Sequence, residues 1–86
     1  MIVSIQLFGA FRQFHHREEL QLACPGATTV ADVRAAFDAY GLAHWPGYRP
    51  GLLRTSAFAS PTTLLRDGQP LPGDGRLAVL PPVSGG

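Results

Sequence analysis

The sequence predicts an α+β fold, in which a mixed sheet of about five strands packs on one main helix. The chain has 86 residues, which is enough for one small domain with a single core. Two segments near its start alternate apolar and polar residues, as strands with one buried face do. A segment with apolar residues at helical spacing follows, and short apolar runs separated by turn residues complete the chain.

The start of the chain predicts an antiparallel hairpin with a wide loop. In the strand 3–8, apolar inward positions alternate with outward ones, and Phe8 falls on the outward side. A second alternating run covers 20–24 and stops at the turn signal Pro25-Gly26. Cys24 shares the inward side of that run, so we expect it to be a small buried side chain.

The next segment predicts a helix with a signal at each end. Thr29 suits the N-cap, and Asp32 three residues later gives the spacing of a capping box. Gly41 suits the left-handed position that ends a helix. The apolar stripe of this helix consists of Val30, Val33, Phe37 and Tyr40.

The segment 44–51 predicts a long connection, because it holds two prolines and two glycines. We expect Trp45 and Tyr48 to fix this connection onto the domain. Further strands are expected at 52–59, 62–65 and 76–80, with turn signals before the last of them.

The order of these elements is β-β-α-β-β-β, in a chain with room for one sheet and one covering helix. A β-grasp (ubiquitin-like) arrangement fits this order, with the first and last strands as central parallel neighbours. We expect the domain to cover residues 1–80 and an extended tail to cover 81–86. If the two central strands pair, Phe8, Ala78 and Leu80 share one outward face, and we expect this apolar patch to dock a partner protein.

Composition excludes several classes of function. The formal net charge of +1 is too balanced for an electrostatic nucleic-acid binder. The single cysteine excludes an internal disulfide and any cysteine-rich metal site, and is consistent with a cytoplasmic protein. No apolar stretch approaches the roughly 18 residues of a membrane helix, so we expect no membrane partner.

Catalytic and metal signals are also weak. His15 and His16 are adjacent, so on an extended chain they are expected to point apart, and we predict no metal site. No nucleophile–base pair and no phosphate-binding glycine loop is present, so we do not expect the chain to be an enzyme alone.

The ending Pro81-Pro82-Val83-Ser84-Gly85-Gly86 carries the chemical prediction. Two prolines favour an extended segment that leaves the sheet, and two glycines can enter a channel too narrow for side chains. A carboxylate on Gly86 could be activated as an acyl-adenylate and then accept sulfur or an amine. The alternative is an inert terminus.

Residues 70–86 closely resemble the end of the small subunit of molybdopterin synthase, a ubiquitin-like sulfur carrier of the MoaD/ThiS type. The strand 3–8 with Arg12 after it, and the helix start 29–33, are similar to that family. The segments 44–51 and 57–59 depart from its pattern.

The resemblance implies that an E1-like adenylyltransferase (MoeB-like) uses ATP to adenylate Gly86, and that a sulfur donor enzyme converts the adenylate to a thiocarboxylate. The chain itself would bind no cofactor. The loaded tail would enter the synthase large subunit (MoaE-like) and give its sulfur to cyclic pyranopterin monophosphate, which builds molybdopterin. Gly85 would keep the tail narrow, and Pro81, Pro82, Val83 and Ser84 would dock it.

Other functions remain open at this point. A sulfur carrier could instead serve thiamine, cysteine or tRNA thiolation. A ubiquitin-like modifier would be joined to target lysines through Gly86, although the chain has no lysine of its own on which to build linked chains.

Overall fold

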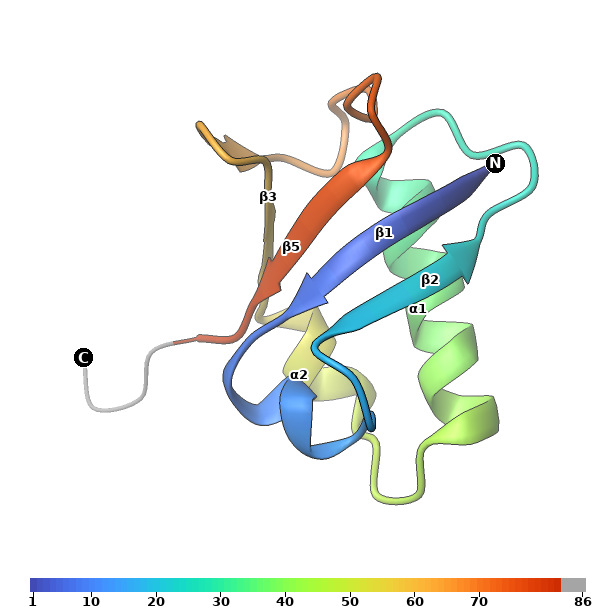
Figure 1. Cartoon of the computed structure of the whole chain (residues 1–86), viewed down its shortest axis with the longest axis vertical. Coiled ribbons are helices and arrows are strands. Elements are labelled where there is room, and N and C mark those ends of the chain that lie inside the picture. The colour runs from blue at the N-terminus through green and yellow to red at the C-terminus, as the bar shows by residue number, and fades with distance from the viewer. Residues whose placement is uncertain (83–86) are drawn as a thin grey trace.

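The computed structural model describes residues 1–82, and its sheet contains five strands in the order β2-β1-β5-β3-β4. The sheet mixes parallel and antiparallel pairs, with β5 lying between β1 and β3 (Figure 1). The strands are β1 (Ile2–Leu7), β2 (Glu19–Ala23), β3 (Ala57–Ala59), β4 (Leu64–Leu65) and β5 (Arg76–Leu80).

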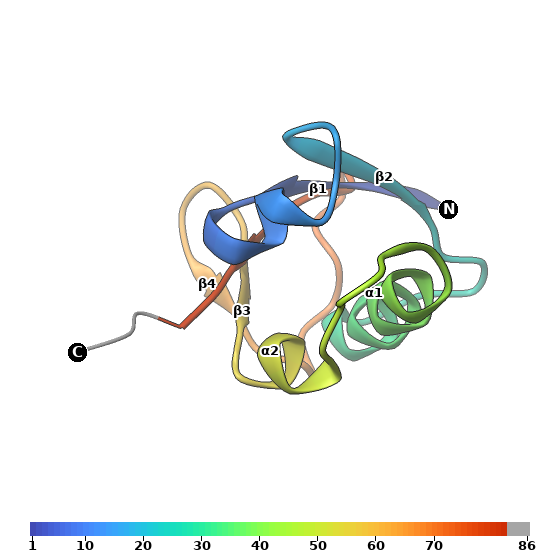
Figure 2. The ribbon, with the colours of Figure 1, turned by 90° about the horizontal axis from the view of Figure 1, so that it is seen from below.

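Helices cover one side of this sheet. Figure 2 shows α1 and α2 on the same side, with the strands beyond them. The helical segments are η1, a 3-10 helix (Gly9–Gln13), α1 (Val30–His44) and α2 (Pro50–Arg54).

The hairpin and the central strand pair are confirmed. β1 pairs with β2 in antiparallel register, with Val3 opposite Leu22 and Ile5 opposite Leu20. β1 pairs with β5 in parallel, with Leu7 opposite Val79. The first and last strands are thus neighbours in the middle of the sheet, as the β-grasp arrangement requires.

Helix α1 begins where the capping signal predicts. The Asp32 carboxylate accepts hydrogen bonds from the backbone N–H groups of Thr28 at 2.9 Å and Thr29 at 3.1 Å. These backbone bonds hold the pKa of the Asp32 carboxyl below its usual value. Two N–H groups that precede the first intrahelical bond are thereby satisfied.

The predicted end of this helix at Gly41 is wrong, because α1 continues to His44. Gly41 is a buried helical residue on which the ring of Tyr48 lies. A β-carbon at Gly41 would stand 2.7 Å from Cδ1 of Tyr48, so glycine is needed here for close packing. The positive φ of 83° is found instead at Gly47, in the connection after the helix.

We expect Gly41→Ala to lower the free energy of unfolding by about 1–3 kcal/mol, because the added methyl displaces a packed aromatic ring. The matched control is Gly51→Ala in α2, where a β-carbon meets nothing within 4 Å. That control should stay within about 0.5 kcal/mol of the parent in urea unfolding. Equal stability of the two variants would contradict the packing role of Gly41.

The predicted strand 52–59 is also wrong over most of its length. Residues Pro50–Arg54 form α2, and the strand β3 is confined to Ala57–Ala59. Pro50 occupies the first turn of α2, where a missing N–H is tolerated, and Leu53 is buried below it. The expected strand at 62–65 is shortened to β4.

The core fills the space between the sheet and the helices. Phe37 of α1 makes edge-to-face contacts with Phe11 at 5.6 Å and with Phe58 at 6.1 Å between ring centroids. Trp45 stacks on Phe14 at 5.7 Å, so the connection after α1 is fixed onto the domain as expected. Tyr48 is buried beside it.

Two polar details complete this packing. The Tyr48 hydroxyl donates a 2.7 Å hydrogen bond to Asp38, and burial together with this bond raises the pKa of Tyr48. Cys24 is buried, as predicted, and burial raises the pKa of its thiol. Within residues 1–82, no helix has the length and apolar character needed to cross a bilayer.

Candidate functional site

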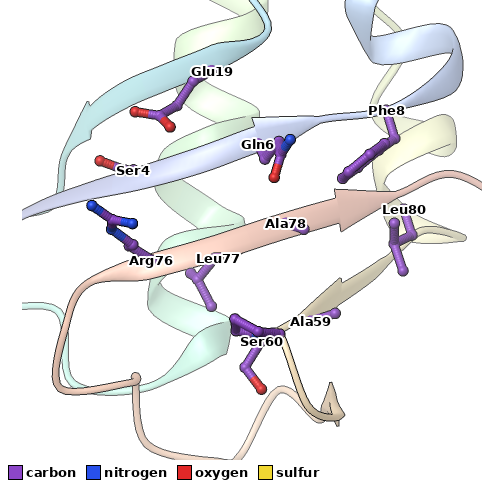
Figure 3. Close-up of a pocket in the computed structure, with 11 residues that line it drawn as sticks. Ser4, Gln6, Phe8, Glu19, Ala59, Ser60, Arg76, Leu77, Ala78 and Leu80 are labelled. Carbon is purple, nitrogen blue, oxygen red and sulfur yellow. The ribbon is translucent and has the colours of Figure 1, made fainter.

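The face of the sheet turned away from α1 carries a shallow groove of about 410 Å³. Figure 3 shows side chains of β1 and β5 projecting from this face. Phe8, Ala78 and Leu80, the three residues expected to share an outward face, all line the groove. The pairing of Leu7 with Val79 brings them together, because it places the next residues, Phe8 and Leu80, side by side.

One end of the groove is apolar. Phe8 is 38% exposed and lies at the same end of the face as Leu80 (Figure 3). Ala78 pairs with Ala59 of β3, and both have small side chains that leave this part of the face open. An apolar surface of this kind, bordered by polar residues, is typical of a protein-docking site.

The other end of the groove is polar. The Ser4 hydroxyl donates to the amide oxygen of Gln21 at 3.0 Å, and the Gln21 amide donates in turn to the Glu19 carboxylate. Arg76 of β5 lies opposite Ser4 in the parallel register. The face therefore changes from polar to apolar along the direction in which β1 and β5 run.

The chain leaves the sheet at the apolar end. β5 ends at Leu80, and Pro81 and Pro82 lead away from it (Figure 1). Pro81 lies directly against Gly9, where a β-carbon would come within 2.6 Å of its Cγ. Gly9 has a φ of +57°, a backbone conformation that residues with a β-carbon disfavour. The predicted tail residues Val83, Ser84, Gly85 and Gly86 lie outside the described residues.

Comparison with known proteins identifies the family. The model of the ThiS family matches residues 5–86. The chain belongs to the ThiS family. It is thus a ubiquitin-like chain of the sulfur-carrier type.

The fold of this ThiS-family chain matches that of a solved structure. SAMP1 from Haloferax volcanii superposes with a TM-score of 0.66 and covers 100% of both chains, at 20% sequence identity. This likeness confirms the ubiquitin-like β-grasp fold. A search of curated proteins found no match.

The contact between Gly9 and Pro81 fixes where the tail of this ThiS-family chain leaves the domain. If Gly86 is adenylated, as the sequence resemblance implies, Gly9→Ala should reduce that adenylation about tenfold, because the added methyl displaces Pro81 and redirects the segment after it. The measurement is the rate of carrier-dependent exchange between ATP and pyrophosphate with an adenylating enzyme.

Gly26→Ala is the matched control for that variant. Gly26 also has a positive φ, of 74°, but a β-carbon there meets nothing within 4 Å. Both variants should lose about 1–2 kcal/mol of stability from the backbone conformation. Equal adenylation rates for the two would show that Gly9 does not position the tail.

The structure corrects the expectation that His15 and His16 point apart. Their ring centroids are 4.6 Å apart, and His15 also packs on Trp45 at 5.6 Å. Burial, with the neighbouring charges of His16 and Arg17, lowers the pKa of His15. Within the part of the chain that the structure describes, no group of three or more His, Cys, Asp or Glu side chains could hold a metal ion.

The sequence did not predict the remaining residues that line the groove, and two of the missed residues, Arg76 and Gly9, bear on the site's charge and on the exit of the tail. Arg76 could have been found, because counting back by twos from Leu80 and Ala78 places it on the same face. Gly9 carried no local signal, since its partner Pro81 lies at the far end of the chain.

Proposed function

We propose that this ThiS-family chain is the sulfur-carrying small subunit of molybdopterin synthase. The observation that carries the proposal is the ending Pro-Pro-Val-Ser-Gly-Gly, which begins directly after a central strand and beside the apolar end of the groove. The described groove supplies a docking surface, and the ending supplies a reactive group without side chains around it.

The proposed chemistry takes place on the carboxylate of Gly86. An E1-like adenylyltransferase (MoeB-like) joins that carboxylate to the α-phosphate of ATP, and pyrophosphate leaves. Hydrosulfide supplied by a sulfur donor enzyme attacks the acyl carbon, the bond to AMP breaks, and a thiocarboxylate remains. The chain needs no bound cofactor for these steps, because ATP is a substrate of the activating enzyme.

The second half of the proposal is transfer of the sulfur. The tail enters the large subunit (MoaE-like), and the thiocarboxylate gives its sulfur to cyclic pyranopterin monophosphate. Once the sulfur is bonded to the acceptor, water attacks the acyl carbon of Gly86, the bond between that carbon and the sulfur breaks, and the carrier returns with an ordinary carboxylate. Because a dithiolene contains two sulfur atoms, two loaded carriers are consumed for each molybdopterin.

This chain's own residues present the tail. Phe8, Ala78 and Leu80 form the apolar surface that a partner covers, and burial of such side chains stabilises a complex. Pro81 and Pro82 restrict the chain before it binds, so less conformational entropy is lost when a channel orders it. Val83 and Ser84, with the two prolines, dock the tail against the partner, and Gly85 passes the narrowest part of the channel.

Membership of the ThiS family fits other sulfur acceptors as well. A carrier for thiamine, cysteine or tRNA thiolation uses the same activation, and a ubiquitin-like modifier uses the same terminal glycine to form an amide bond. The Pro-Pro-Val that precedes Ser-Gly-Gly favours the synthase among these.

The test has two stages. Incubation with ATP, the adenylyltransferase and a sulfur donor should raise the intact mass by the difference between one sulfur and one oxygen, and omission of ATP should prevent this. The loaded chain is then mixed with the synthase large subunit and cyclic pyranopterin monophosphate, and molybdopterin is measured by the fluorescence of its oxidation product. Loading without transfer would assign the chain to another sulfur pathway, and absence of loading would reject the carrier function.

A further inference from the structure

Arg76 lies at the polar end of the docking groove, and its backbone is held in place there. It pairs with Ser4 in the parallel ladder, and its backbone N–H donates to the Asp74 carboxylate at 3.0 Å. The neighbouring backbone is held as well, because the N–H of Ser4 donates to the carbonyl of Gly75 at 2.8 Å. Figure 3 shows the guanidinium beside Ser4, on the face that carries Phe8 and Leu80.

This guanidinium lacks an acidic partner among residues 1–82. Two other arginines have one: Arg12 pairs with Glu18 at 3.0 Å, and Arg34 pairs with Asp67 at 3.0 Å. The acidic side chains near Arg76 already accept hydrogen bonds, in the case of Asp74 from the backbone N–H of Arg76 itself. Glu19 accepts from the Gln21 amide, and Asp74 accepts from a backbone N–H.

The spacing along β5 places Arg76 within reach of any protein that holds the tail. Arg76 and Leu80 are four residues apart on one strand, which corresponds to roughly 13 Å. A protein-protein interface of ordinary size buries about 800 Å² on each partner, a patch wider than this separation. A partner that covers Phe8 and Leu80 and grips Pro81 therefore also covers Arg76.

Covering an arginine removes water from its charge, and a charge that loses water without gaining a partner destabilises the complex. No carboxylate of the described residues forms an ion pair with Arg76, although Glu19 lines the same groove. The partner must therefore supply the carboxylate. A carboxylate suits the role, because it accepts two parallel hydrogen bonds from one guanidinium.

We propose that the adenylating enzyme which docks on this groove presents an Asp or Glu carboxylate to Arg76, while an apolar part of the same surface covers Phe8 and Leu80. The inference rests on the proposed function, because it takes that enzyme as the occupant of the groove. Arg76 acts as a specificity residue: it fixes the orientation of the carrier about the tail and rejects a surface with a cation at this point.

The experiment uses the full chain, ATP and the E1-like adenylyltransferase of the same organism, with pyrophosphate exchange as the readout. Arg76→Gln should raise the KM for the carrier about tenfold at low salt and leave kcat unchanged, and Arg76→Glu should raise KM further. High salt should reduce the difference in KM between Arg76→Gln and the parent chain, because salt screens the attraction between the two charges. Arg76→Lys should recover part of the loss, because it restores the charge without the planar fork.

Arg17→Gln is the matched control, since it removes one exposed cation beside Tyr40, outside the docking groove. Its KM should stay within about twofold of the parent chain. If the parent chain supports exchange and Arg76→Gln has an unchanged KM, the pairing is refuted and the carrier function stands. If the parent chain supports no exchange, both the carrier function and the pairing are refuted.

Discussion

Removal of Gly86 alone is expected to abolish sulfur loading completely. The proposed reaction forms each covalent intermediate on the carboxylate of that residue, and a chain ending at Gly85 places its carboxylate one residue short, roughly 3.5 Å from the reacting position. A displacement of that size removes the alignment that adenylation requires. Intact-mass measurement after incubation with ATP, adenylyltransferase and sulfur donor reads the result directly.

The deletion should leave the fold intact. Every buried apolar residue among the described residues precedes Leu80, so the thermal unfolding midpoint should match that of the parent chain. Gly51→Ala, a substitution in α2 where a β-carbon meets nothing within 4 Å, leaves the tail unchanged and should still load. Loading that persisted after removal of Gly86 would contradict the proposed site of activation.

Phe8→Asp should reduce the efficiency of adenylation about 100-fold, because Phe8 is the aromatic side chain of the groove's apolar end, and aromatic anchors that a partner buries contribute much of the binding free energy of an interface. The substitution replaces a partly exposed ring by a charge that the partner must desolvate. The loss should lie in KM, measured by pyrophosphate exchange over a range of carrier concentrations.

Leu42→Asp provides the comparison for that variant. Leu42 is a 61% exposed leucine of α1, the helix on the other side of the sheet, so the same kind of change is made away from the groove. Both chains should retain the parent circular dichroism spectrum. If Leu42→Asp lost as much activity as Phe8→Asp, the outer face of the sheet would not be the docking surface.

The elements that the sequence predicts well are those whose signals are local. Alternation across the strand 3–8 fixes which side of β1 is buried, and the spacing of Thr29 and Asp32 marks the start of α1. The neighbouring positions of Phe8 and Leu80 follow from one assumption about topology, namely that the first and last strands of the chain pair in parallel. The shared outward face of Phe8, Ala78 and Leu80 could therefore be predicted before the structure.

The elements that it predicts poorly depend on tertiary contacts. Gly41 has the local character of a helix end, yet α1 passes through it because the ring of Tyr48 occupies the space where a side chain would lie. The two residues Leu52-Leu53 are too short a run to show either helical or strand periodicity. The sequence therefore could not distinguish a short helix that begins at Pro50 from a strand. The tail's contact with Gly9 joins residues from opposite ends of the chain and leaves no trace in either segment.

The central position of β5 also has a consequence for how the protein is made. During synthesis the β1–β2 hairpin and the β3–β4 pair emerge first, but nothing joins them in one sheet until residues 76–80 insert between β1 and β3. Closing a sheet through such distant segments is a late and slow event in folding. A nascent chain thus exposes no complete groove on the ribosome, and the proposed activating enzyme could dock only on chains whose domain is already finished.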